Sequence, residues 1–143
     1  MKKSTEPDKI IRGQKIFRHK VIRNDTYRIY VCFILGGDID KINEKFQLQI
    51  DDDQEIYCQT NTGSIKIDKD DYRCIFIILN PNIKSKINYA TLAHETIHTA
   101  NHIFHMRYIK YDYDNDEPFA YLVEWIMHNA VNFYKKYLHY EYE

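Results

Sequence analysis

The amino-acid sequence predicts an α+β fold, in a single domain that spans residues 1–143. Short runs rich in β-branched and aromatic residues fill much of the first half of the chain and end at turn residues. The second half holds two long segments with apolar residues at helical spacing. Because no repeat or flexible linker separates the two halves, we expect a small twisted sheet packed against the helices in one core.

Residues 1–9 are charged and are expected to form a mobile tail. The segment 10–22 is compatible with either a helix or a strand. A clear strand follows at 27–35 and ends at Gly36-Gly37. Asp38 can then cap a short helix that carries Ile39, Ile42 and Phe46.

A β-hairpin is predicted next. Residues 55–60 and 64–67 read as strands on either side of Asn61-Thr62-Gly63, which has the composition of a tight turn. The run 72–79 is the most apolar strand of the chain and is expected near the centre of the sheet.

Two long helices complete the prediction, one at about 86–109 and one from Glu117 to about Tyr140. No proline or glycine interrupts the first, and apolar residues recur along both. The residues expected to begin the helices are Asn82 or Ser85 for the first, and Asp116 with Pro118 for the second.

The first long helix contains His94-Glu95-Thr96-Ile97-His98, which matches the H-E-x-x-H zinc signature. Two histidines four residues apart project from the same face of a helix and can reach one metal ion. Glu95 follows the first histidine, where a carboxylate can act as general base toward water. The sequence therefore predicts a zinc site on this helix.

A catalytic zinc ion needs a third protein ligand. The pattern H-E-x-x-H-x-x-G-x-x-H fails, because Asn101 and Phe104 stand where it needs Gly and His. His105 is one residue out of register, and a straight helix carries His102 too far from an ion held by the pair. We therefore prefer a carboxylate from the next helix, Glu117, with Glu124 as its rival.

Over about residues 86–128 the chain resembles the gluzincins, thermolysin-like zinc peptidases in which a downstream glutamate completes the motif. It looks most like small single-domain zincin-like proteins of bacteria and phages. Strands followed by two long helices, the first carrying the motif, is also their order of elements. The matching residues are His94, Glu95, His98 and Glu117, with Ala120 in the small position of an E-x-x-A element.

This resemblance also implies a His or Tyr that stabilises the oxyanion, and Tyr121 and His128 are the candidates. Tyr121 stands where many gluzincins have Asp. The resemblance implies Zn²⁺ as cofactor and a peptide or protein as substrate, which could pair with an exposed sheet edge near 56–67. The chief alternative is a non-catalytic zincin-like binding or virion-associated protein with a structural zinc site. A zinc amide hydrolase with a non-peptide substrate is a weaker one.

The composition of the chain bears on nucleic-acid binding, on membrane insertion or secretion, and on the state of the cysteines. The formal net charge of −1 and the lack of a basic, aromatic-rich stretch argue against nucleic-acid binding. No secretory signal and no run of transmembrane length is seen. Cys32, Cys58 and Cys74 lack metal-site spacing and lie in apolar runs, so reduced thiols in a cytoplasmic protein are expected.

Overall fold

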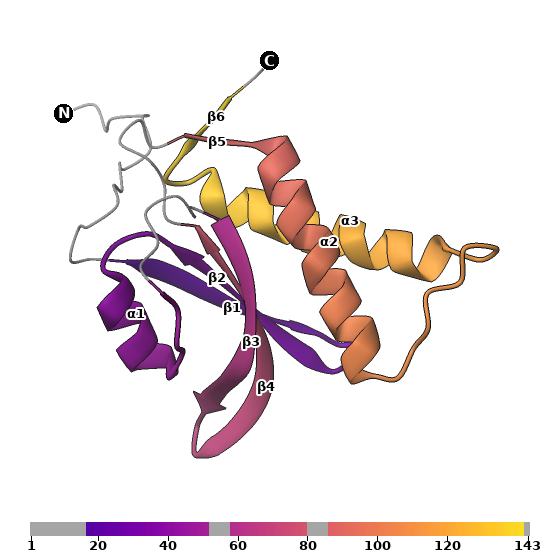
Figure 1. The fold of residues 1–143 in the computed structure, drawn as a ribbon, viewed down its shortest axis with the longest axis horizontal. Helices are drawn as coiled ribbons and strands as arrows, with labels where there is room; N and C mark the ends of the chain where they lie inside the picture. Colours follow the sequence, from indigo (N-terminus) through magenta and orange to yellow (C-terminus); the bar gives the residue numbers. More distant parts are fainter. Residues whose placement is uncertain (1–16, 52–57, 80–85, 142–143) are drawn as a thin grey trace.

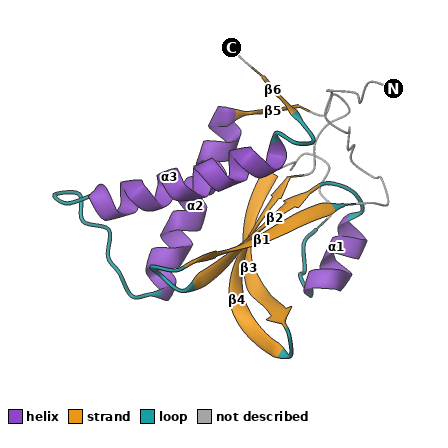
Figure 2. Ribbon diagram, turned by 180° about the vertical axis from the view of Figure 1, so that it is seen from behind, coloured by secondary structure: helices purple, strands orange, loops and turns teal. Residues whose placement is uncertain are grey.

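The computed structural model describes residues 17–51, 58–79 and 86–141. A four-stranded mixed sheet lies between one short helix on one face and two long helices on the other, as Figure 1 and the reverse view in Figure 2 show. The predicted α+β class is confirmed.

The strands of this sheet are β1 (Arg18–Asn24), β2 (Ile29–Leu35), β3 (Cys58–Ile67) and β4 (Asp70–Leu79). Their spatial order is β1-β2-β4-β3. The pairs β1–β2 and β3–β4 are antiparallel, whereas β2 and β4 run parallel. The most apolar strand, β4, is therefore internal as predicted, and β3 lies at an edge.

The helices are α1 (Ile39–Phe46), α2 (Tyr89–Met106) and α3 (Glu117–Tyr134). Two short strands, β5 (Lys86–Asn88) and β6 (His139–Glu141), form a separate parallel pair beside the start of α2. The motif helix and the second long helix are thus present, with shorter bounds than the sequence predicted.

Strand alternation divides the core between the two faces of the sheet. On β2, Val31 and Phe33 face α2 and α3, whereas Cys32 and Ile34 face α1. All four are fully buried, which explains why β2 reads as a continuous apolar run. The hydroxyl of Tyr134 donates to the carbonyl oxygens of Ile34 (3.1 Å) and Ile77 (2.8 Å) and so fixes the end of α3 to the sheet.

The predicted turn at residues 61–63 is wrong, because β3 runs through it and pairs with β4 along its whole length. The turn lies instead at Asp68-Lys69, where Asp68 adopts a positive φ of 57°. Gly63 serves packing, since a Cβ there would lie 3.0 Å from Leu48 and 3.1 Å from Phe76. A glycine that allows close approach resembles a turn glycine in sequence.

The helix boundaries follow from local backbone chemistry. Asp38 caps α1 as predicted, its carboxylate accepting a hydrogen bond from the Asp40 amide at 2.9 Å. The end of α2 is set by Tyr108, which has a left-handed φ of 57°, and the Ile109 amide then donates to Phe104 O at 2.9 Å. The predicted caps Asn82 and Ser85 lie outside the described residues.

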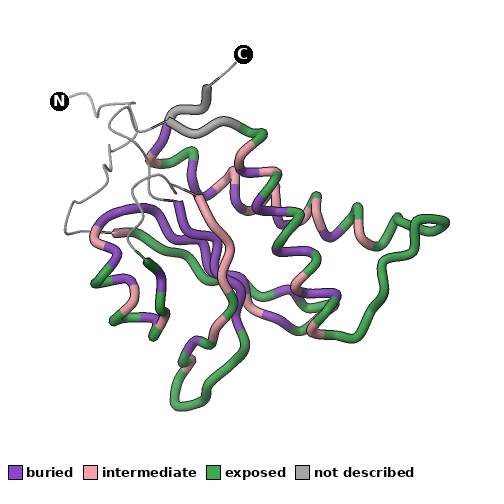
Figure 3. The backbone as a smooth tube through the Cα atoms, viewed as in Figure 1, coloured by how far each residue is buried: buried purple, intermediate pink, exposed green. Residues whose placement is uncertain are grey.

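The sheet and the connection between the two long helices differ in how far they are buried. Figure 3 shows the strands at the centre buried, while the whole segment 107–116 is exposed.

Cys32, Cys58 and Cys74 are free thiols, and burial raises the pKa of each, that of Cys32 to about 12. In the described part of the chain, no helix has the length and hydropathy needed to span a bilayer.

Candidate functional site

The motif lies on α2, which buries one side against the sheet and exposes the other. Leu92, Thr99 and Ile103 are buried on the core side. His94 and His98 are both exposed, because residues four apart share a face and this face points away from the core. The helix therefore presents its two histidines to solvent, as a ligand-accepting site requires.

The two imidazoles converge. The Nε2 atoms of His94 and His98 are 3.1 Å apart, and the ring centroids are 4.7 Å apart with the ring planes at 78°. Two Zn–N bonds of about 2.05 Å at a tetrahedral angle would separate the nitrogens by about 3.3 Å. The pair therefore matches the spacing of two ligands on one metal ion.

Glu95 occupies a different environment from its neighbours. It is only 8 % exposed, and its carboxylate Oε2 accepts a hydrogen bond from the Thr60 hydroxyl at 2.5 Å. The same hydroxyl lies 3.2 Å from the backbone oxygen of Glu95. Burial and the negative charge of Glu95 raise the pKa of the Cys58 thiol nearby, so this thiol stays protonated. The motif glutamate is thus held against the edge strand β3.

Helix α3 packs on another side of α2. The Thr96 hydroxyl lies 3.7 Å from the sulfur of Met127 on α3. Residues two apart on a helix point in nearly opposite directions, so the side of α2 that bears Thr96 lies away from His94. Any ligand from α3 would have to reach around α2 to meet the histidines.

Glu117 also lies far along α3 from the contact between Met127 and Thr96. At about 1.5 Å per residue, it lies roughly 15 Å along the axis from Met127. Glu124 is nearer to Met127 along the axis of α3. Like Glu117, however, it belongs to the helix that packs on the Thr96 side of α2. Among the residues that the structure describes, no group of three His, Cys, Asp or Glu side chains could hold a metal ion.

The donor set found is therefore two histidines, one short of the three protein ligands usual for catalytic zinc. A ligand role for Glu117 or Glu124 stays a prediction from spacing. So do the oxyanion roles of Tyr121 and His128, neither of which is brought to the histidine pair. The His128 Nε2 lies 3.1 Å from Asn132 Nδ2, and Tyr121 is 65 % exposed near the start of α3.

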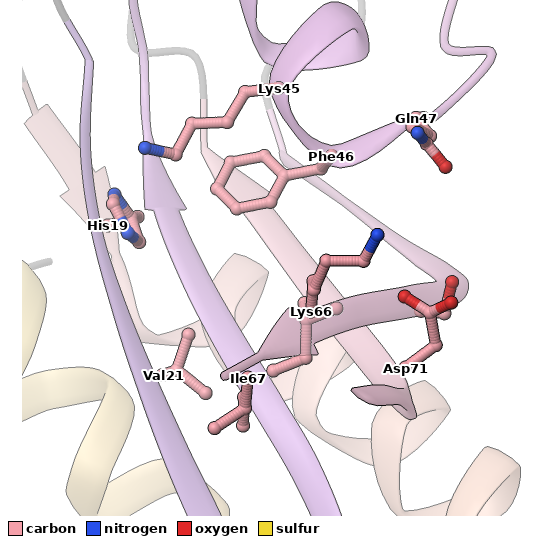
Figure 4. A pocket seen from close by; sticks show the side chains of 10 residues that line it. His19, Val21, Lys45, Phe46, Gln47, Lys66, Ile67 and Asp71 are labelled. Carbon is pink, nitrogen blue, oxygen red and sulfur yellow. The ribbon is translucent and has the colours of Figure 1, made fainter. Parts of the chain in front are cut away.

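A cavity of about 480 Å³ lies on the α1 side of the sheet, away from the motif. Figure 4 shows the ammonium group of Lys45, at the end of α1, directed toward His19 on β1. Burial and this ammonium group lower the pKa of His19. No residue of the H-E-x-x-H motif contributes to this cavity.

Sequence reasoning missed Thr60, the residue in closest contact with the motif glutamate. Its position in a β-rich run gives no sign of that contact, because the contact depends on how β3 packs against α2. Comparison with protein-family models, with curated proteins and with solved structures finds no match for this chain. The geometry around the motif therefore provides the structural basis for a function.

Proposed function

We propose that this protein is a zinc-dependent metallopeptidase of the small zincin-like kind. The observation that carries the proposal is the 3.1 Å convergence of His94 and His98 on the exposed face of α2, beside a glutamate held at the sheet edge. Two imidazoles on one face are the arrangement that a shared metal ion needs. The resemblance of the motif region to gluzincins supports the same chemistry.

The chain contributes three elements to such a reaction. His94 and His98 would hold the ion, which supplies Lewis acidity and a lowered pKa of water when bound. Among the described strands β3 pairs only with β4, so its other side offers backbone donors and acceptors to an extended peptide. Glu95 takes the proton from the attacking water and passes it to the leaving amine.

Thr60 is the positioning residue of this scheme. Its hydroxyl fixes one carboxylate oxygen of Glu95 at 2.5 Å and leaves the other oxygen without a bond among the described residues. A carboxylate with one oxygen anchored and one free can accept a proton in a defined direction. Because Thr60 belongs to β3, the same strand would align both the base and the peptide.

A non-catalytic zincin-like binding protein is the second candidate, and the hydrogen bond of Glu95 favours it. The two histidines are fewer than the three ligands of a catalytic zinc site and the four of a structural one, so the number of donors favours neither function. The bond from Thr60 gives Glu95 a structural use, which is to tie α2 to β3. A glutamate after the first histidine is therefore explained by either function. The two functions differ only in whether Glu95 transfers a proton.

The substitution Glu95→Gln tests the choice. The amide oxygen can still accept from Thr60, so the α2–β3 contact survives, but the amide cannot take a proton from water. We expect zinc binding and fold to be retained while hydrolysis falls by at least ~10²-fold. Cleavage of a peptide library by zinc-loaded protein supplies the measurement, and Glu44→Gln, at an exposed position on α1 across the sheet, is the control.

Cleavage at an undiminished rate by the Glu95→Gln variant would exclude Glu95 as the base. If the zinc-loaded wild type cleaves no peptide in the library, the binding-protein function replaces the peptidase.

A further inference from the structure

A groove of about 540 Å³ lies between the β1–β2 turn and the first turns of α3. Its volume falls in the range of small-ligand sites. We call it the α3 groove. Its lining residues are Asn24, Thr26, Tyr27, Asn115, Glu117, Pro118, Tyr121, Leu122 and Trp125.

Aromatic side chains dominate the walls of the α3 groove. Tyr27, Tyr121 and Trp125 contribute three rings, with Pro118 and Leu122 beside them. Tyr121 keeps 65 % of its surface exposed, although it lies over a largely apolar cavity. The faces of aromatic rings carry partial negative charge, so such walls attract organic cations.

Glu117 is the one charged side chain among the described residues that line the α3 groove. It forms no ion pair with another described residue, which leaves its carboxylate available. The α3 dipole places about half a positive charge at this end of the helix. Asp112, Asp114 and Asp116 precede the helix with three negative charges, which slightly exceed the sum of that half charge and the positive charges of Arg107 and Lys110. The guanidinium of Arg107 bonds to carbonyl oxygens of the β1–β2 turn.

A buried amide adds a second polar group. Asn24 is 7 % exposed, and its Oδ1 accepts from the Tyr27 amide at 2.8 Å. Its Nδ2 group donates to no other residue within the described part of the chain. An occupant that carries a carbonyl oxygen, as a peptide does, would satisfy this donor.

We propose that the α3 groove binds an arginine side chain of a peptide or protein partner. A guanidinium group is planar and weakly hydrated, and its paired N–H groups match a carboxylate such as that of Glu117. It also stacks on aromatic faces, whereas a lysine ammonium loses more hydration in a largely apolar groove. This assignment uses no residue of the histidine pair and does not depend on zinc.

Trp125 makes the proposal directly measurable, because it is the chain's only tryptophan and it lines the α3 groove. The probe is N-acetyl-arginine N-methylamide, titrated while tryptophan fluorescence is followed. The matched neutral probe is the citrulline analogue, which keeps the shape and loses the charge. We expect saturable change with the arginine probe and binding at least about tenfold weaker with the citrulline probe.

Glu117→Gln should weaken arginine binding by about tenfold or more, whereas Glu124→Gln on the same helix should leave it unchanged. Tyr121→Ala, at an exposed position, should also weaken it. Equal binding of the citrulline probe would overturn the proposal, as would tighter binding of choline or no saturable change at millimolar arginine. The comparison of probes uses wild-type protein, so it holds even if the Glu117 variant fails to fold.

Discussion

Helices α2 and α3 both carry residues that the sequence predicts for a zinc site, but only those on α2 come together. His94 and His98 converge to 3.1 Å because one helix fixes both of them. Glu117 lines a groove at the start of α3, on a helix that packs against another side of α2. Spacing within a helix determines geometry, whereas spacing between helices determines only what the loop can reach.

The largest effect is expected at the histidines. His94→Ala and His98→Ala should each lower zinc affinity by ~10²-fold or more, since each removes one of two converging donors. Elemental analysis and calorimetric titration of purified protein measure this. His105→Ala, an exposed histidine on the same helix, is the control and should change nothing. A wild type that folds but takes up no zinc would remove the metal site altogether.

A smaller effect is expected at Thr60 if the proposed function holds. Thr60→Val removes the hydroxyl that bonds to Glu95 with little change in shape. We expect kcat to fall by about tenfold with KM and zinc affinity unchanged, because the base loses its anchor and keeps its proton chemistry. Thr60→Ser restores the hydroxyl and should restore kcat. A purely structural contact would lower the stability of the Val variant and leave its kcat intact.

The smallest effect is expected at Glu117. The spacing of the motif predicts that Glu117→Ala loses zinc, whereas the position of Glu117 in the structure predicts that zinc affinity stays within about threefold of wild type. We adopt the second expectation for Glu117, and Glu124→Ala is measured beside it because Glu124 is the rival ligand. Zinc titration of both variants decides between the two arguments. Selective loss of zinc in the Glu117 variant would establish it as the third ligand.

Much of the fold follows from the sequence because its signals are local. Asp38 and the apolar spacing that follows it specify α1, and the apolar run of β4 specifies an internal strand. The hairpin turn was misplaced because Gly63 serves close packing, which only the tertiary structure defines. Strand β1 was ambiguous because five of its seven residues are exposed, so its apolar pattern is weak.

As with the fold, the sequence predicts only the part of the candidate site that depends on local signals. His94, Glu95 and His98 are set by one helix, and the sequence locates them. Their partners belong to other elements, and no pattern along the chain shows that Thr60 meets Glu95 or that the β1–β2 turn forms a groove with Glu117. Both relations depend on how a strand or a turn packs against a helix.

The parallel pairing of β2 with β4 has a consequence for the order of folding. The β1–β2 and β3–β4 hairpins are each closed by a short turn, so both can form from local contacts. The centre of the sheet joins residues such as Tyr30 and Cys74, and the loop between them contains α1 and β3. Closing that loop costs chain entropy before the central contacts can form. We therefore expect pulse-labelled hydrogen exchange to protect the two hairpins before the β2–β4 amides, and simultaneous protection would contradict this order.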